Sequence, residues 1–249
     1  MKFALISDIH ANLEALEAVL ARIPDLPVLC LGDTVGYGVQ PNEVINRIRG
    51  RASHVIMGNH DLACADGTGI DEFNPVSACA AQWTNHQLSQ ASIDWLLGLP
   101  YVVSTPTFAL VHGSPQDPER FRYVLNWSQA RFALDCPDAH KLVTFVGHSH
   151  CPTVFKLTLP NDEITITHVK DDQTMQLRTD SRYIVNVGSV GQPRDRDPRA
   201  CYAVYDDESL SVSWHRVPYD ITATQARIFA STMAPGAAQA IADRLALGQ

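Results

Sequence analysis

The chain repeats one local pattern, in which a short apolar run leads directly into a small cluster of polar residues. The first run covers residues 3–7 and is followed by Asp8 and His10. A run this short, bounded by polar residues, is typical of a buried strand. A segment whose apolar residues recur at helical spacing, 13–23, separates it from the next run. Strands that alternate with helices pair in parallel through right-handed crossovers, so the N-terminal half predicts a βαβαβ unit.

Five apolar runs end in polar groups of this kind. The runs cover residues 3–7, 28–31, 54–57, 108–111 and 142–146, and the groups that follow them are Asp8/His10, Asp33, Asn59/His60, His112 and His148/His150. In open α/β sheets, side chains that follow parallel strands meet at one edge, where ligands bind. Carboxylates, an amide oxygen and imidazoles form a mixed set of metal ligands. So few groups can hold two ions only if a carboxylate is shared, and Asp33, alone at its strand end, is the expected bridge.

The rest of the chain completes one domain. Residues 62–100 interrupt the alternation with two helical segments, and we expect them to form a helical insertion. Residues 153–217 alternate in the β manner between short turns, and two helices within about 222–247 end the chain. No internal repeat or linker is visible. We therefore expect a single α/β (α+β) domain over residues 1–249.

Composition and charge exclude several classes of protein. The net charge is −8, from 19 Lys and Arg against 27 Asp and Glu, and no long basic run interrupts this balance. A basic nucleic-acid-binding stripe is therefore not expected. The six cysteines include no CxxC pair, which favours buried reduced thiols over disulfides or thiolate ligands. No apolar run reaches the length of a signal peptide or a membrane span, so we expect no membrane partner and a cytoplasmic location.

Taken together, the polar groups resemble the five motifs of the calcineurin-like metallophosphoesterase superfamily. The matching segments are Asp8-Ile9-His10, Gly32-Asp33, Gly58-Asn59-His60-Asp61, His112 after a strand, and Gly147-His148-Ser149-His150. They occur in order over roughly residues 1–155, each after an expected strand. A further run, residues 186–195, resembles small bacterial and archaeal members often labelled phosphodiesterases. The resemblance implies a β-sandwich flanked by helices.

The resemblance also implies a site with two divalent metal ions. One ion would be held by three residues and the second by three others, with one carboxylate shared. These are Asp8, His10 and His150 for the first ion, Asn59, His112 and His148 for the second, and Asp33 for both. Oxygen and nitrogen ligands without thiolate favour Mn²⁺, with Fe, Co, Ni or Zn as alternatives.

The expected chemistry is hydrolysis of a phosphate ester. Two ions can bind a phosphate together and share a water that becomes a bridging hydroxide, the expected nucleophile. His60 is implied to face the substrate and to donate a proton to the leaving oxygen. Asp61 either orients His60 or caps the following turn. Asn12, Ser189 and Arg194 are candidate substrate contacts, although Asn12 also suits a helix N-cap and the other two suit a structural turn.

One departure from the family separates the alternatives. Protein-phosphatase-like members usually follow the second motif with an Asp-Arg pair that grips phosphate, whereas Thr34 follows that motif here. We therefore expect a phosphodiesterase for small organic or nucleotide substrates. The alternatives are a phosphatase for phosphoprotein or dinucleoside polyphosphate, and a non-catalytic scaffold, against which the intact His60 argues. Tyr37, Tyr123 and Asn126 are assigned ordinary surface or core roles, and the oligomeric state stays open.

Overall fold

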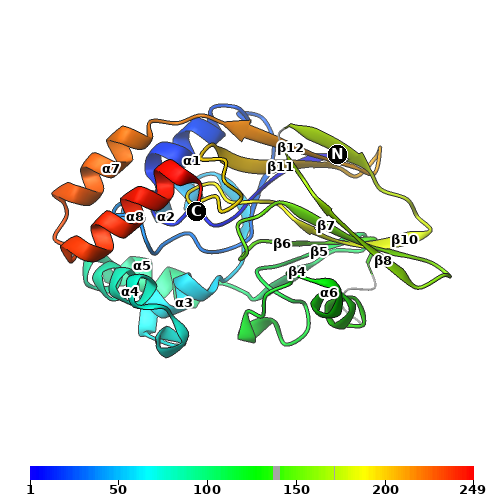
Figure 1. The fold of residues 1–249 in the computed structure, drawn as a ribbon, viewed down its shortest axis with the longest axis horizontal. Helices are drawn as coiled ribbons and strands as arrows, with labels where there is room; N and C mark the ends of the chain where they lie inside the picture. The colour runs from blue at the N-terminus through cyan, green and yellow to red at the C-terminus, as the bar shows by residue number, and fades with distance from the viewer. Residues whose placement is uncertain (137–140, 171) are drawn as a thin grey trace.

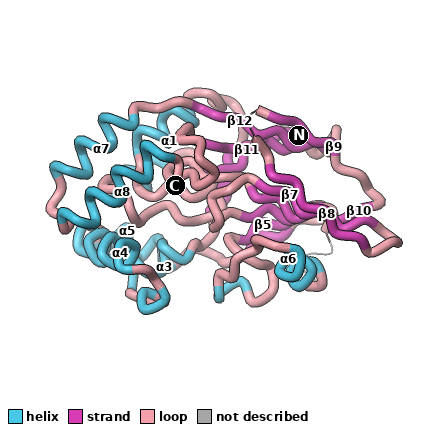
Figure 2. The backbone as a smooth tube through the Cα atoms, in the orientation of Figure 1, coloured by secondary structure: helices cyan, strands magenta, loops and turns pink. Residues whose placement is uncertain are grey.

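A computed structural model describes residues 1–136, 141–170 and 172–249 of the protein. Within these residues the chain forms two six-stranded sheets and a set of helices. Figures 1 and 2 show the strands on one side of the molecule and most of the helices on the other. The mixed α/β class expected from the sequence is confirmed.

The N-terminal half forms the expected βαβαβ unit. Its elements are β1 (Lys2–Ile6), α1 (Leu13–Leu20), β2 (Val28–Cys30), α2 (Pro41–Arg49) and β3 (Ala52–Val55). The three strands pair in parallel, β1 with β2 and β2 with β3. The third strand lies two residues earlier than the predicted 54–57. The Ile56 amide still donates to the Cys30 carbonyl of β2 at 3.1 Å, whereas the Met57 amide donates to the Pro100 carbonyl at 2.8 Å and not to β2.

The first sheet is completed by strands from the C-terminal part of the chain. They are β9 (Gln173–Gln176), β11 (Ala200–Asp206) and β12 (Ser211–Val217). The strand order is β3-β2-β1-β11-β12-β9, and β11 pairs antiparallel with β1. The N- and C-terminal parts of the sequence therefore share one sheet, as a single domain requires.

The second sheet carries the other two predicted motif strands. Its order is β4-β5-β6-β10-β7-β8. The strands are β4 (Val102–Ser104), β5 (Phe108–Val111), β6 (Val143–Val146), β7 (Thr153–Thr158), β8 (Glu163–His168) and β10 (Ser181–Asn186). β5, β6 and β10 are parallel, so their carboxyl ends meet at one edge.

The two sheets pack face to face and helices cover both outer faces. The core between the sheets contains Leu31, Phe145, Tyr205 and Trp214, none more than 1% exposed. A second core joins the outer face of the first sheet to α1 and α2. A third joins the second sheet to α6 (Trp127–Leu134). The β-sandwich flanked by helices is thus confirmed.

The 62–100 segment and the C-terminal helices pack together beside the sandwich. The helices are α3 (Asn59–Asp66), α4 (Pro75–Gln87), α5 (Gln90–Leu97), α7 (Ile221–Ala230) and α8 (Pro235–Leu247). A short 3-10 turn, η1 (Ile70–Glu72), lies between α3 and α4, and a second, η2 (Pro118–Arg120), follows β5. α4 contacts α8, as Figure 1 shows. Helix α3, which begins at Asn59, was not predicted. Among the described residues, no helix is long and apolar enough to cross a bilayer.

Candidate metal centre

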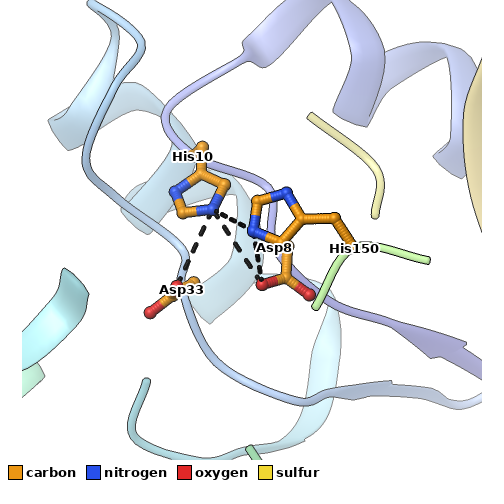
Figure 3. A group of neighbouring side chains, drawn as sticks. All are labelled: Asp8, His10, Asp33 and His150. Carbon is orange, nitrogen blue, oxygen red and sulfur yellow. Dashed lines mark hydrogen bonds and ion pairs between the residues drawn. The ribbon is translucent and has the colours of Figure 1, made fainter. Parts of the chain in front are cut away.

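Polar side chains from the ends of β1, β2 and β6 converge between the two sheets. The His10 Nε2 atom lies 3.2 Å from His150 Nε2 and 3.7 Å from Asp33 Oδ2. The His150 Nε2 atom lies 3.2 Å from Asp8 Oδ1. Figure 3 shows these four side chains turned toward one another. Their ligand atoms all lie within 4.8 Å of each other, close enough to surround one metal ion.

A second group of ligand atoms adjoins the first. Asp33, His112 and His148 place their ligand atoms within 4.8 Å of one another, with His112 Nε2 at 3.3 Å from Asp33 Oδ2. Asn59 lines the same cavity as His148. The Asp33 carboxylate belongs to both groups, so the arrangement offers two cation positions joined by one bridging carboxylate.

The backbone around these residues is held in an uncommon conformation. Asp8, His10, Asp33, His148 and His150 all have positive φ angles, between 50° and 66°. This left-handed region is sparsely populated by residues other than glycine, and such positions cluster at functional sites. Hydrogen bonds between the loops hold it in place, for example from the Asp8 amide to the Gly32 carbonyl at 3.0 Å.

Three of the histidines have their tautomer fixed by a backbone carbonyl. The Nδ1 atom of His10 faces the Val35 carbonyl at 3.1 Å, and that of His112 faces the Leu31 carbonyl at 2.6 Å. His150 Nδ1 faces the carbonyl of Gln192. A carbonyl can only accept, so each Nδ1 carries the proton and each Nε2 offers its lone pair to the centre. This is the usual arrangement behind metal-binding histidines.

Buried polar atoms without a hydrogen-bond partner test whether metal ions fit. In the described part of the chain they include Asp33 Oδ2, Asn59 Oδ1 and His112 Nε2. Leaving a buried acceptor unpaired costs about 1–3 kcal/mol, more for a charged group. The oxygens of Asp33 and Asn59 are acceptors, and His112 Nε2, 3.3 Å from Asp33 Oδ2, offers a lone pair when the ring is neutral, so all three atoms suit a positively charged partner. The donor set therefore fits divalent metal ions.

The protonation states of the metal-free cluster reflect burial and close charges. Burial holds the pKa values of His10, His148 and His150 well below their usual range, which leaves neutral imidazoles ready to bind metal. Burial also raises the pKa of Asp8 to about 7. For His112, burial acts to lower the pKa, but the Asp33 carboxylate outweighs it and raises the value to about 9. A cation in contact would favour the charged carboxylates and the neutral imidazole.

Two glycines allow this close packing. A Cβ added at Gly58 would collide with the Asp33 carboxylate, and one added at Gly147 would lie 2.7 Å from Asp8 Oδ2 and closer still to Ser7 Oγ. The glycines that precede the third and fifth motifs therefore leave room for the two carboxylates.

His60 occupies an aromatic cage next to the cluster. Its ring lies 4.9 Å from that of His10, 4.6 Å from Tyr37 and 4.5 Å from Phe73, measured between centroids. Burial lowers the pKa of His60 to about 4. The His60 imidazole belongs to neither ligand group. The backbone amide of His60 donates to Asp33 Oδ1 at 2.8 Å.

The hydrogen bonds of the Asp61 carboxylate do not support a role as the catalytic partner of His60. Its carboxylate accepts hydrogen bonds from the Thr34 amide at 2.8 Å, the Thr34 hydroxyl at 2.6 Å, the Val35 amide at 3.2 Å and the Gly58 amide at 3.1 Å. No hydrogen bond joins it to His60 in the described residues. Asp61 thus caps the start of α3 and ties it to the loop after β2, which is the second of the two roles considered from the sequence.

The structure does not support the expected substrate contacts by Asn12 and Ser189, because both side chains make hydrogen bonds within the protein. Asn12 caps α1 through the Ala15 amide at 3.1 Å and donates to the Gly191 carbonyl at 2.9 Å. Ser189 donates to the Asp8 carbonyl at 2.9 Å. Both are buried, at 2% and 0% exposure, so neither can reach a ligand without losing these bonds.

Arg194 lies close to the cluster. It donates to the Tyr37 hydroxyl at 3.1 Å and to Gln192 Oε1 at 2.9 Å. After burial, its charge is among the causes that lower the pKa values of His60 and His150. The described residues give it no carboxylate partner, so this cation is available to an anion.

A cavity of about 900 Å³ opens beside Asn59 and His148. Tyr123, assigned an ordinary role from the sequence, lines it and stacks on the His148 ring at 3.8 Å. Phe73 also lines it and was not singled out at all. Neither aromatic belongs to a motif, so only their position in the fold marks them.

The sandwich, the convergence of polar side chains that follow strands of both sheets, and the shared Asp33 are typical of a metallophosphoesterase. The model of the calcineurin-like phosphoesterase superfamily domain matches residues 1–209, and the chain belongs to this family. Members are hydrolases that depend on two metal ions.

Relatives match over the whole chain. A crystal structure of a metallophosphoesterase from Sphaerobacter thermophilus is 38% identical, with a TM-score of 0.85, and the match covers 100% of this chain and 99% of that one. An uncharacterized protein of Methanocaldococcus jannaschii is 33% identical over 99% of this chain and 98% of its own length. A hypothetical protein from Pyrococcus horikoshii, 22% identical, shares the fold with a TM-score of 0.74, over 96% of this chain and 97% of that one.

Proposed function

We propose that the protein is a phosphodiesterase that uses two divalent metal ions, Mn²⁺ first among them. The observation that carries this proposal is the Asp33 carboxylate, which belongs to two groups of buried candidate ligand atoms. Asp8, His10 and His150 would hold one ion, and Asn59, His112 and His148 the other. Bound ions of this kind supply a nucleophile from water and positive charge for the phosphoryl oxygens.

His60 would serve the leaving oxygen. In the metal-free chain its imidazole is neutral at pH 7, because burial lowers its pKa to about 4. An anionic phosphate beside the ring favours the protonated form, and a neutral ring can still donate a hydrogen bond. The close ring contacts with Tyr37 and Phe73 restrict the imidazole to one orientation.

Arg194 would take the place of the phosphate-gripping arginine that this chain lacks after its second motif. Its guanidinium is held by two neutral oxygens, those of Tyr37 and Gln192. A phosphate oxygen adds the attraction of a full negative charge, and an arginine can hold a phosphate through two parallel N–H···O bonds. The half-buried Arg194 supplies one positive charge, which matches a diester monoanion better than a monoester dianion.

The test compares bis-p-nitrophenyl phosphate with p-nitrophenyl phosphate in the presence of Mn²⁺. The leaving group is the same, so the ratio of kcat/KM values reports phosphoryl charge and pocket shape. We expect the diester to be favoured. A tenfold preference for the monoester, about 1.4 kcal/mol of transition-state stabilisation, contradicts the proposal and moves the phosphatase alternative ahead.

Arg194→Ala shows whether Arg194 acts as a clamp. A large fall in kcat/KM for the monoester, with little change for the diester, would identify Arg194 as a substitute for the missing arginine. An equal fall for both esters would instead assign it to general phosphate binding.

A further inference from the structure

The cavity beside Asn59 and His148 is larger than a phosphate group requires. Its volume of about 900 Å³ falls within the range of about 300–1,000 Å³ that is typical of sites for small organic molecules. Its walls come from residues 59–73, around α3 and η1, and from residues 114–132, which lead into α6. Two metal ligands therefore form one side of a pocket that can hold a substantial organic group.

Four phenylalanine and tyrosine side chains line the pocket. They are Phe73, Phe121, Tyr123 and Phe132. Tyr123 and Phe132 remain 42% and 45% exposed, although large aromatic side chains usually bury most of their surface. Tyr123 lies nearly parallel to the His148 ring, with 17° between their planes. This pair places a flat aromatic surface directly beside a metal ligand.

Polar groups and charges of both signs accompany the aromatic surface, since Glu72 and Glu119 line the cavity together with Arg120 and Arg122. Ser114, Ser128 and Gln129 line the pocket and can hydrogen-bond to a sugar or to the edge of a base. Arg122 lies 5.5 Å from the centre of the Phe132 ring and pairs with Asp117 at 3.3 Å. Arg120 also lines the pocket and has no ion pair in the described parts of the chain. Flat rings and hydrogen-bonding groups together match a nucleoside whose phosphate lies on the metal ligands.

We propose that this cavity binds the nucleoside half of a phosphodiester, the half that stays attached to phosphorus. The inference rests on the proposed function, which sets the phosphate on the metal ligands. His60, which would serve the leaving oxygen, contacts Phe73 but does not line the cavity. The cavity thus receives the other substituent of phosphorus.

The first experiment compares two diesters with the same leaving group, thymidine 5′-(p-nitrophenyl phosphate) and methyl p-nitrophenyl phosphate. Stacking of a base on aromatic side chains is worth about ten- to a hundredfold in affinity, so kcat/KM should favour the thymidine ester by at least about tenfold. Phe132→Ala should remove most of this preference. Phe229→Ala, a control on α7 with a phenylalanine that is 53% exposed and outside the cavity, should keep it.

The readout is the ratio of the kcat/KM values for the two esters, measured with the same enzyme. Loss of metal in a variant lowers both values alike and leaves this ratio unchanged. Equal kcat/KM values for the two esters in the wild type would overturn the inference. So would a preference that Phe132→Ala and Phe229→Ala retain equally.

A binding experiment separates this inference from the proposed function. Calorimetric titration of the Mn²⁺-loaded protein compares adefovir, an adenine-bearing phosphonate, with methylphosphonate; neither can be hydrolysed at its phosphorus–carbon bond. We expect adefovir to bind at least about tenfold more tightly, and Phe132→Ala to abolish the difference. If neither diester is hydrolysed but this difference is found, the diesterase function fails and the cavity assignment stands. Equal affinities for the two phosphonates would overturn the cavity assignment.

Discussion

Replacing Asp61 by alanine should destabilise the fold without acting on the chemistry directly. The substitution leaves the amides of Thr34, Val35 and Gly58 without their acceptor, all in the buried interior. Each unsatisfied donor costs about 1–3 kcal/mol, and entry of water into the vacated space offsets part of the sum. We therefore expect a loss of about 3–5 kcal/mol, a large part of the 5–15 kcal/mol that is typical of a domain.

The assay is urea unfolding followed by circular dichroism in EDTA, so that metal binding does not contribute. Asp66→Ala is the control: it lies in the same helix, and its carboxylate accepts one exposed hydrogen bond, from the Thr68 amide at 2.9 Å. The control should change stability by no more than about 0.5 kcal/mol. The reasoning is refuted if Asp61→Ala costs less than about 1 kcal/mol. A kcat loss as large as that of His60→Ala would then restore the orienting role.

Three further predictions concern the site. His60→Ala should keep the metal content while kcat falls by about 10²–10⁴-fold, and a parallel loss of metal would show that His60 is a ligand. Gly147→Ala should displace the Asp8 carboxylate and weaken metal binding by about 10–100-fold in a Mn²⁺ titration, and unchanged affinity would contradict the packing argument. His112, whose pKa is raised to about 9, must release a proton when metal binds, so the apparent affinity should fall about tenfold per pH unit below that value. Below about pH 7 protonation of Asp8 should steepen the fall, and pH-independent affinity between 6 and 8 would contradict both pKa shifts.

The positions of the candidate ligand residues could be predicted because strand endings leave a strong local signal. Short apolar runs before Asp8, Asp33 and His112 predict strands, and parallel strands bring their carboxyl ends together whatever their distance in sequence. The sequence indicates helix α3 less clearly. It is stabilised by the Asp61 carboxylate, whose partners lie in the loop after β2, more than twenty residues away.

The pocket residues and the structural polar residues could not be read from the sequence. An aromatic residue in a loop, such as Tyr123, looks the same whether it packs in a core or faces a cavity. Ser189 lies in a family-like run, which suggested substrate contact, yet its hydroxyl is bound to the Asp8 carbonyl. Such assignments depend on which buried groups find partners, and that is decided by tertiary packing.

The most direct test of the two-metal centre is the metal content of protein saturated with Mn²⁺ and freed of excess ions. Elemental analysis should approach two equivalents per chain. Asp33→Asn should lose most of both, because the Asp33 Oδ2 atom lies 3.7 Å from His10 Nε2 in the first ligand group and 3.3 Å from His112 Nε2 in the second. A content that stays at zero under saturating Mn²⁺, or an Asp33→Asn variant that keeps two equivalents, would contradict the bridging role of Asp33.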